Sequence, residues 1–168
     1  VKSRTLGPFD WGVAASAYDY RTDGKRQNAA SNTLPGAASG GAGTLADGAG
    51  TGWVTLALKG IWRPPVSAGS QTVDFGYQLA DYRLRYLTSS IPGDWITDAP
   101  GALASNVRGR TQLQSLYAQD AWAFAPRWKT VLGLRVEQWS ASDGLTEFSA
   151  TNSLNYRPRR ESFVSPKA

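Results

Sequence analysis

The feature that most constrains this chain is an alternation of apolar and polar side chains with a period of two. It is clearest over residues 128–139, where one set of alternate positions is mainly apolar and the other is largely polar. The first set is Trp128, Thr130, Leu132, Leu134 and Val136, and the second is Lys129, Val131, Gly133, Arg135, Glu137 and Trp139. Because successive side chains of a β-strand point to opposite faces, the segment predicts a strand with one apolar face.

The same alternation occurs in residues 9–20, 52–62, 71–85 and 111–124. Their apolar sets are Phe9, Trp11, Val13, Ala15 and Ala17; Val54, Leu56, Leu58, Gly60 and Trp62; Val73, Phe75, Tyr77 and Leu79; and Leu116, Ala118, Trp122 and Phe124, with Asp120 as an awkward member. A further strand is expected to begin near Phe163. The pattern therefore predicts an all-β chain of about six strands.

The connections between these segments alternate between long and short. Residues 21–51, 86–109 and 140–160 are long, whereas residues 63–70 and 125–127 are short. This alternation is typical of an antiparallel up-and-down transmembrane β-barrel, with large extracellular loops and small periplasmic turns. Loops of this length are uncommon inside compact soluble domains. No apolar run approaches the roughly 20 residues that a membrane helix requires.

Aromatic residues gather on the apolar face beside the short connections. A belt of this kind marks the interface of a membrane barrel with the lipid headgroups. The expected belt residues are Phe9, Trp11, Trp62, Trp122, Phe124 and Trp128. At the other end of the strands, Tyr20, Trp53 and Trp139 fall in the opposite register. That register places them in the lumen, in a loop or at a local bulge.

Composition excludes several classes of function. Cysteine and histidine are both absent, which removes disulfides, thiolate metal sites and the commonest general base and metal ligand. We therefore expect no catalytic residues, no metal site, no cofactor and no enzymatic activity. The net charge of +5 is spread over single Lys and Arg residues, with one cluster at residues 157–160, so we expect no nucleic-acid partner.

Three stretches carry a family resemblance. Residues 116–137 read LYAQDAWAFAPRWKTVLGLRVE, residues 165–167 read SPK, and residues 47–64 contain the pair Gly52-Trp53 and the run KGIWRP. The first resembles the recurrent LYAQD-W---P-W----GLR-E hairpin of TonB-dependent receptors. The second resembles the opening of the strand that follows in that family. The third is similar to barrel segments of siderophore-type members.

This resemblance implies a barrel of about 22 strands that encloses an N-terminal plug. It also implies the Gram-negative outer membrane, and import of a ferric siderophore or similar scarce nutrient with energy supplied by the TonB complex through the plug. No plug, TonB box, signal peptide or methionine is recognisable in the sequence. We expect residues 1–168 to be a partial barrel domain of a longer protein, with lipid, TonB and a small-molecule substrate as partners.

Six residues are candidates for ligand contact. Arg83 and Arg85 could attract an anionic chelate near the top of the third strand, and Trp95 could stack on a ligand from a loop. The remaining candidates share the polar face of the clearest strand: Arg135, Glu137 and Trp139. The alternative interpretations are a solvated surface for the first two, packing within its own loop for Trp95, and a ladder of paired luminal side chains for Arg135 and Glu137.

Two rival functions remain open from the sequence. The first is another outer-membrane barrel, such as a passive porin or an autotransporter translocator. The second is a soluble secreted β-sandwich, for instance a carbohydrate-binding module, whose apolar face would pack against a second sheet instead of lipid.

Overall fold

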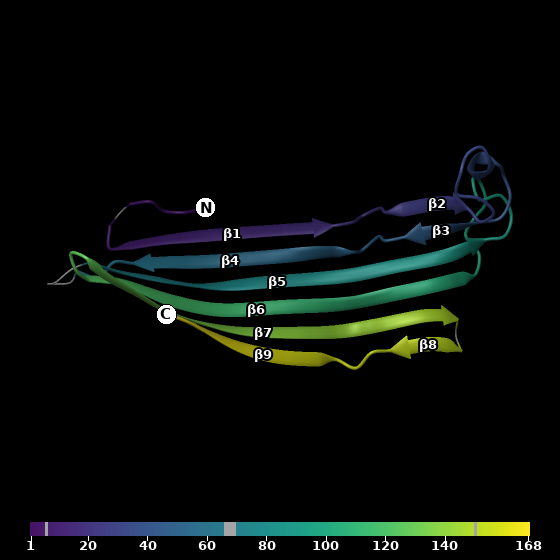
Figure 1. Ribbon diagram of the computed structural model, residues 1–168. Coiled ribbons are helices and arrows are strands. Elements are labelled where there is room, and N and C mark those ends of the chain that lie inside the picture. The colour runs from purple at the N-terminus through teal and green to yellow at the C-terminus, as the bar shows by residue number, and fades with distance from the viewer. Residues whose placement is uncertain (6, 66–69, 150) are drawn as a thin grey trace.

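The chain forms a single antiparallel sheet in a computed structural model that describes residues 1–5, 7–65, 70–149 and 151–168 (Figure 1). The strands are β1 (Phe9–Asp19), β2 (Gly24–Asn28), β3 (Gly43–Asp47), β4 (Gly52–Trp62), β5 (Ser70–Ile91), β6 (Leu103–Ala125), β7 (Trp128–Ser149), β8 (Asn152–Asn155) and β9 (Arg159–Lys167). One 3-10 turn, η1 (Gly36–Ala38), lies between β2 and β3. The all-β, up-and-down prediction is confirmed.

Several of the nine strands follow one another end to end, so the sheet is six strands wide, in agreement with the predicted number of strands. Strand β3 pairs with residues 87–91 of β5, and β4 pairs with residues 73–83 of the same strand, so β3 and β4 follow one another along one edge of β5. Likewise β8 and β9 both pair with β7. The short connections gather at one end of the sheet and the long ones at the other (Figure 1). The sheet does not close on itself.

The predicted bounds of the long loops are wrong. Strand β5 continues to Ile91, β6 begins at Leu103 and β7 continues to Ser149, so only residues 92–102 connect β5 to β6. The expected first loop likewise contains the β2–β3 hairpin. Since a transmembrane strand needs only about 9–11 residues, the far halves of these strands extend beyond the membrane. Beyond the membrane neither face of a strand has to be apolar, and the apolar side chains move from one face of the strand to the other.

The change of phase is visible along β5. Up to Leu79 the apolar side chains share a face with Tyr77, but from Asp81 onward that face carries Asp81 and Arg83. The register that aligns Val13, Leu58, Tyr77, Leu116, Val136 and Val164 across the sheet defines the apolar face. The opposite, polar face carries Ser16, Thr55, Gln78, Ser115 and Arg135.

The sheet has almost no hydrophobic core of its own. The buried hydrophobic residues of the described part are Ile91 and Leu145. In contrast, Leu116 is 63% exposed and Leu132 is 56% exposed, and both lie on the apolar face. A β-sandwich would cover this face with a second sheet, and the described residues form only one. A continuous exposed apolar face is stable only in an apolar solvent such as lipid.

Asp120 lies on the apolar face opposite Val73 and Leu132. Its carboxylate is not isolated there, because the side-chain amide of Gln71 donates a 2.7 Å hydrogen bond to Oδ2. The neighbouring aromatic pair Trp122 and Phe124 places this contact at the short-turn end of the strand, with ring centroids 5.4 Å apart. A carboxylate near the interface costs less than one at mid-membrane.

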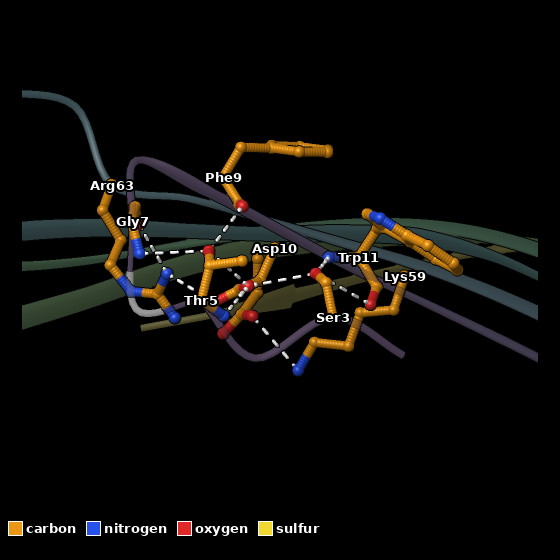
Figure 2. Close-up of polar contacts among 9 residues, drawn as sticks. Ser3, Thr5, Gly7, Phe9, Asp10, Trp11, Lys59 and Arg63 are labelled. Atoms are coloured by element: carbon orange, nitrogen blue, oxygen red, sulfur yellow. Dashed lines mark hydrogen bonds and ion pairs between the residues drawn. The ribbon is translucent and has the colours of Figure 1, made fainter. Parts of the chain in front are cut away.

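A buried carboxylate organises the short-turn end of β1 (Figure 2). Asp10 is only 4% exposed. It accepts hydrogen bonds from the backbone N–H of Thr5 at 2.8 Å, from the Ser3 hydroxyl at 3.0 Å and from Nη1 of Arg63 at 2.9 Å. Arg63 also donates to the carbonyl oxygen of Gly7 at 3.0 Å. The turn before β1 is therefore fixed to the end of β4.

No helix in the described part of the chain is long and apolar enough to cross a membrane.

Gly60 leaves room for the aromatic ring of Phe75, which lies against the sheet at this position. A Cβ atom at this position would lie 2.5 Å from Cζ of Phe75, whose ring also approaches Phe9 with centroids 6.4 Å apart. We predict that Gly60→Ala displaces this ring and lowers the free energy of unfolding by roughly 1 kcal/mol or more, as other overpacking substitutions do. Denaturant unfolding of the full-length protein in detergent measures the effect.

Gly12→Ala is the matched control, since its nearest neighbours are 3.8 Å away and it lies on adjacent β1. Equal unfolding free energies for the two variants would contradict the prediction.

Candidate functional site on the polar face and its loops

A hydrogen-bonded grid on the polar face centres on Arg135. Its Nε donates to Glu137 Oε1 at 2.9 Å, and its Nη2 donates to Gln78 Oε1 at 3.1 Å and to Ser115 Oγ at 3.0 Å. Strands β5, β6 and β7 are tied together by these contacts. The Arg135 side chain is still 38% exposed, so part of the guanidinium remains available to a ligand.

Small side chains beside this grid leave a shallow recess of about 390 Å³. The residues of the polar face that line it are Ala14, Ser16, Thr55, Ala57, Gln78, Ala80, Leu113, Ser115 and Arg135. Ser16 and Thr55 share a hydrogen bond of 2.6 Å between their hydroxyl oxygens. The volume is within the range of small-molecule sites.

An aromatic cluster lies farther along the polar face, toward the long loops. The rings of Tyr18 and Trp53 are stacked with centroids 4.6 Å apart, and Tyr20 meets Tyr18 edge-on at 5.0 Å. Tyr82 lies opposite Trp53 in the register. Tyr20 and Trp53, which fall in the opposite register in the sequence, therefore lie on the polar face. Beyond the membrane the apolar side chains have moved to that face.

Trp139 occupies the same polar face on β7, opposite Leu113. The guanidinium carbon of Arg159 lies 5.8 Å from the centroid of its ring, within the range of a cation–π contact. Trp139 follows Arg135 and Glu137 along one strand, so the structure brings these three candidates onto one surface.

Trp95 links the two large loops. Its Nε1 donates to the carbonyl oxygen of Ser39 at 2.9 Å, and its backbone N–H donates to Gly41 at 2.8 Å. Its carbonyl oxygen accepts from Nη1 of Arg26, which also donates to the carbonyl oxygen of Asp98 at 2.8 Å. The side chain packs directly against Gly43, where any Cβ would collide with it.

Arg83 and Arg85 are not part of this surface. They lie on the opposite face, in register with Arg110 and Arg108 of β6. The structure thus separates the six candidates into a polar-face group, a loop residue and two arginines on the outside of the sheet.

Sequence reasoning missed Tyr18, Gln78, Ser115 and Arg26. The first three alternate in phase with residues already placed on the polar face, so the period of two was the signal that could have found them. Arg26 had no such signal, because its role depends on contacts 69 and 72 residues away in sequence. Within the described ranges, no group of three or more acidic residues is arranged to hold a metal ion.

A family model described as TonB dependent receptor-like, beta-barrel, matches residues 4–168. The chain belongs to the TonB-dependent receptor family. It is therefore part of the barrel of a Gram-negative outer-membrane transporter that is coupled to TonB and takes a small-molecule substrate. The apolar face is the lipid face and the polar face lines the lumen of the receptor. No curated protein and no solved structure matches the chain.

The six expected belt residues of the receptor lie on the lipid face at the short-turn end. Phe9 is directly opposite Trp62, Trp11 follows on β1, and Trp122 and Phe124 lie on β6. Trp128, which opens β7, is 68% exposed. Contact of these rings with the periplasmic headgroups stays a prediction.

We predict that Trp95→Ala weakens the link between the two loops of the receptor. Loss of the ring removes the bond to Ser39 and the packing against Gly43, so residues 24–47 should exchange amide hydrogens faster. Hydrogen–deuterium exchange on the full-length receptor in detergent measures this. Ile96→Ala is the control, because Ile96 is 52% exposed in the same loop. Unchanged exchange in residues 24–47 of the Trp95 variant would refute the link.

Proposed function

We propose that the parent receptor imports a ferric siderophore, or a similarly large and scarce anionic solute, and binds it against the luminal face between Arg135 and the aromatic cluster of Tyr18 and Trp53. The observation that carries the proposal is the partly exposed Arg135 side chain beside a recess, with the stacked rings of Tyr18 and Trp53 two positions farther along β1 and β4. Ferric chelates combine negative charge with flat, polarisable groups, which suit an arginine and an aromatic surface respectively.

Glu137 has a positioning role in this proposal. Its carboxylate accepts from Nε of Arg135, while Nη2 of the same guanidinium donates to Gln78 and Ser115 across the sheet. The guanidinium is thereby held in one orientation before a ligand arrives, which lowers the entropic cost of binding. Trp139 adds a further ring on the same face.

The joined loops form the entrance to this surface. Because Trp95 and Arg26 tie residues 92–102 to the β2–β3 hairpin, the mouth of the receptor moves as one piece on this side. We further propose that a plug domain of the parent protein packs against the luminal grid and transmits the pull of TonB. Arg83 and Arg85 face away from the lumen and take no part in this binding site.

The test measures binding and uptake of radioactive ferric chelates by an iron-starved strain that lacks the receptor gene and carries full-length variants. We expect Arg135→Gln and Trp53→Ala each to weaken chelate binding about ten-fold, which corresponds to about 1.4 kcal/mol. Val136→Ala changes the neighbouring residue on the lipid face and should leave binding unchanged. Receptor abundance in the outer membrane must be equal in all strains.

Two results would sink the proposal. One is wild-type uptake of every ferric chelate by the strain without the receptor gene. The other is chelate affinity in both luminal variants that equals that of the Val136→Ala control.

A further inference from the structure

The regular pairing of the sheet is interrupted along one line that crosses it (Figure 1). The interrupted segments are residues 20–23 between β1 and β2, 48–51 between β3 and β4, Gly109 of β6, 143–144 of β7 and 156–158 between β8 and β9. The registers place all of them level with residues 84–86 of β5, either directly or through the strands between. We call this level the break line.

The break line divides the sheet into two parts with different surroundings. Below it the strands carry the apolar face, which on β5 ends at Leu79. Above it lie β2, β3, β8 and the far ends of β5, β6 and β7, which are paired with one another. The upper part also includes the two loops that Trp95 and Arg26 fasten together. Each part is therefore held together by hydrogen bonds of its own.

Regular strand pairing between the two parts is sparse. Among the strand pairs that the structure describes, only β5 and β6 keep an unbroken register through the break line. On the other side of β6 the single residue Gly109 lies opposite two residues of β7, Asp143 and Gly144. Asp143 has a left-handed backbone with a φ of 56°, and a Cβ at Gly109 would lie 3.9 Å from Cα of Gly144. Bulges of this kind bend a strand, and hinges use a few such residues to absorb changes in φ and ψ.

At the other edge of β5 a side chain replaces the missing backbone pairing. The hydroxyl of Thr51 accepts from the backbone N–H of Arg85 at 2.9 Å and donates to the carbonyl oxygen of Arg85 at 2.7 Å. Thr51 is only 7% exposed, and the φ of 87° at the preceding Gly50 favours glycine. Nε of Arg83 adds an exposed bond of 2.8 Å to the carbonyl oxygen of Gly50. One buried hydroxyl thus forms the two bonds that a strand partner would form.

We propose that the break line is a hinge about which the extracellular part of this sheet tilts as one body, with the β5–β6 ladder as its flexible spine and Thr51 as the clip that limits the tilt. The wall of the barrel itself bends in this motion, which distinguishes it from the movement of loops on a fixed wall. The line lies beyond Leu79, so a bend there displaces none of the apolar residues that contact lipid on β5.

The tilt has a consequence for the luminal face. Above the line that face carries a row of side chains aligned across four strands: Tyr86, Val107, Thr146 and Leu154. Below the line the same face carries the stacked rings of Tyr18 and Trp53. A tilt toward the lumen brings the row closer to the rings and narrows the mouth from this side. Enclosure of a ligand by this motion rests on the proposed function, whereas the hinge itself does not.

The experiment measures distances between pairs of spin labels in the ligand-free full-length receptor in detergent by pulsed electron paramagnetic resonance. The labels are attached after Leu116→Cys below the line, and after Ile96→Cys and Leu154→Cys in the loop and the strand above it, where all three native side chains are more than half exposed. This sequence has no cysteine, and any cysteine elsewhere in the receptor is replaced by serine. We expect both distances from Leu116 to be more broadly distributed than the distance between Ile96 and Leu154.

The clip is tested by a matched pair of substitutions. Thr51→Val removes the hydroxyl with little change in shape and leaves the N–H and the carbonyl oxygen of Arg85 without this partner. We expect it to broaden both distances from Leu116 further and to speed amide hydrogen exchange at Arg85 about ten-fold. Thr51→Ser keeps the hydroxyl and is expected to match the wild type in both measurements.

Two results would overturn the hinge. One is a broad distribution confined to the distances that involve Ile96, which would mean that a loop moves on a rigid wall. The other is equal distances and equal exchange in the two Thr51 variants. Should Thr51→Val fail to fold, the wild-type distances carry the test. A distance between Ile96 and Leu154 as broad as the two from Leu116 would then contradict motion as one body.

Discussion

The structure depends on one continuous ladder of backbone hydrogen bonds between antiparallel strands. Among the residues that the structure describes, no second layer packs against the sheet, so the ladder alone decides which side chains share a face. With β5 held in place, a slip of one residue between β5 and β6 would move Leu116 to the lumen and Ser115 to the lipid. Apolar solvent on one side and water on the other therefore select a single register.

The same ladder carries three surfaces with different chemistry. On the lipid side it aligns an apolar band, and beyond that band it brings Arg83 and Arg85 opposite Arg110 and Arg108. On the luminal side it brings Arg135 within hydrogen-bonding distance of Gln78 and Ser115, which lie on two other strands. Each surface is assembled from positions far apart in the sequence, with no loop or helix required to place them.

The sequence predicted the membrane-spanning halves of the strands well, because there the two solvents impose a strict period of two. It failed above the membrane for a physical reason. Tyr82 and Leu84 continue the alternation of β5, but on the opposite face from Tyr77 and Leu79, so the pattern breaks at Ala80, and the predicted strand ended at residue 85 instead of at Ile91. The Arg135–Glu137 pair was visible in one strand. The contacts of Trp95 with Ser39 were not, because loop-to-loop packing leaves no periodic signal.

The far halves of β5, β6 and β7 determine which part of the cell surface a particle from outside contacts first. From Asp81 to Ile91 the strand β5 rises roughly 25 Å or more along the membrane normal, past the lipid heads. An antibody or a bacteriophage approaching the bacterium would meet the joined loops before it met lipid. Because Arg26 and Trp95 fasten those loops together, the recognised surface would be one discontinuous epitope, and a sequence change in either loop would alter it.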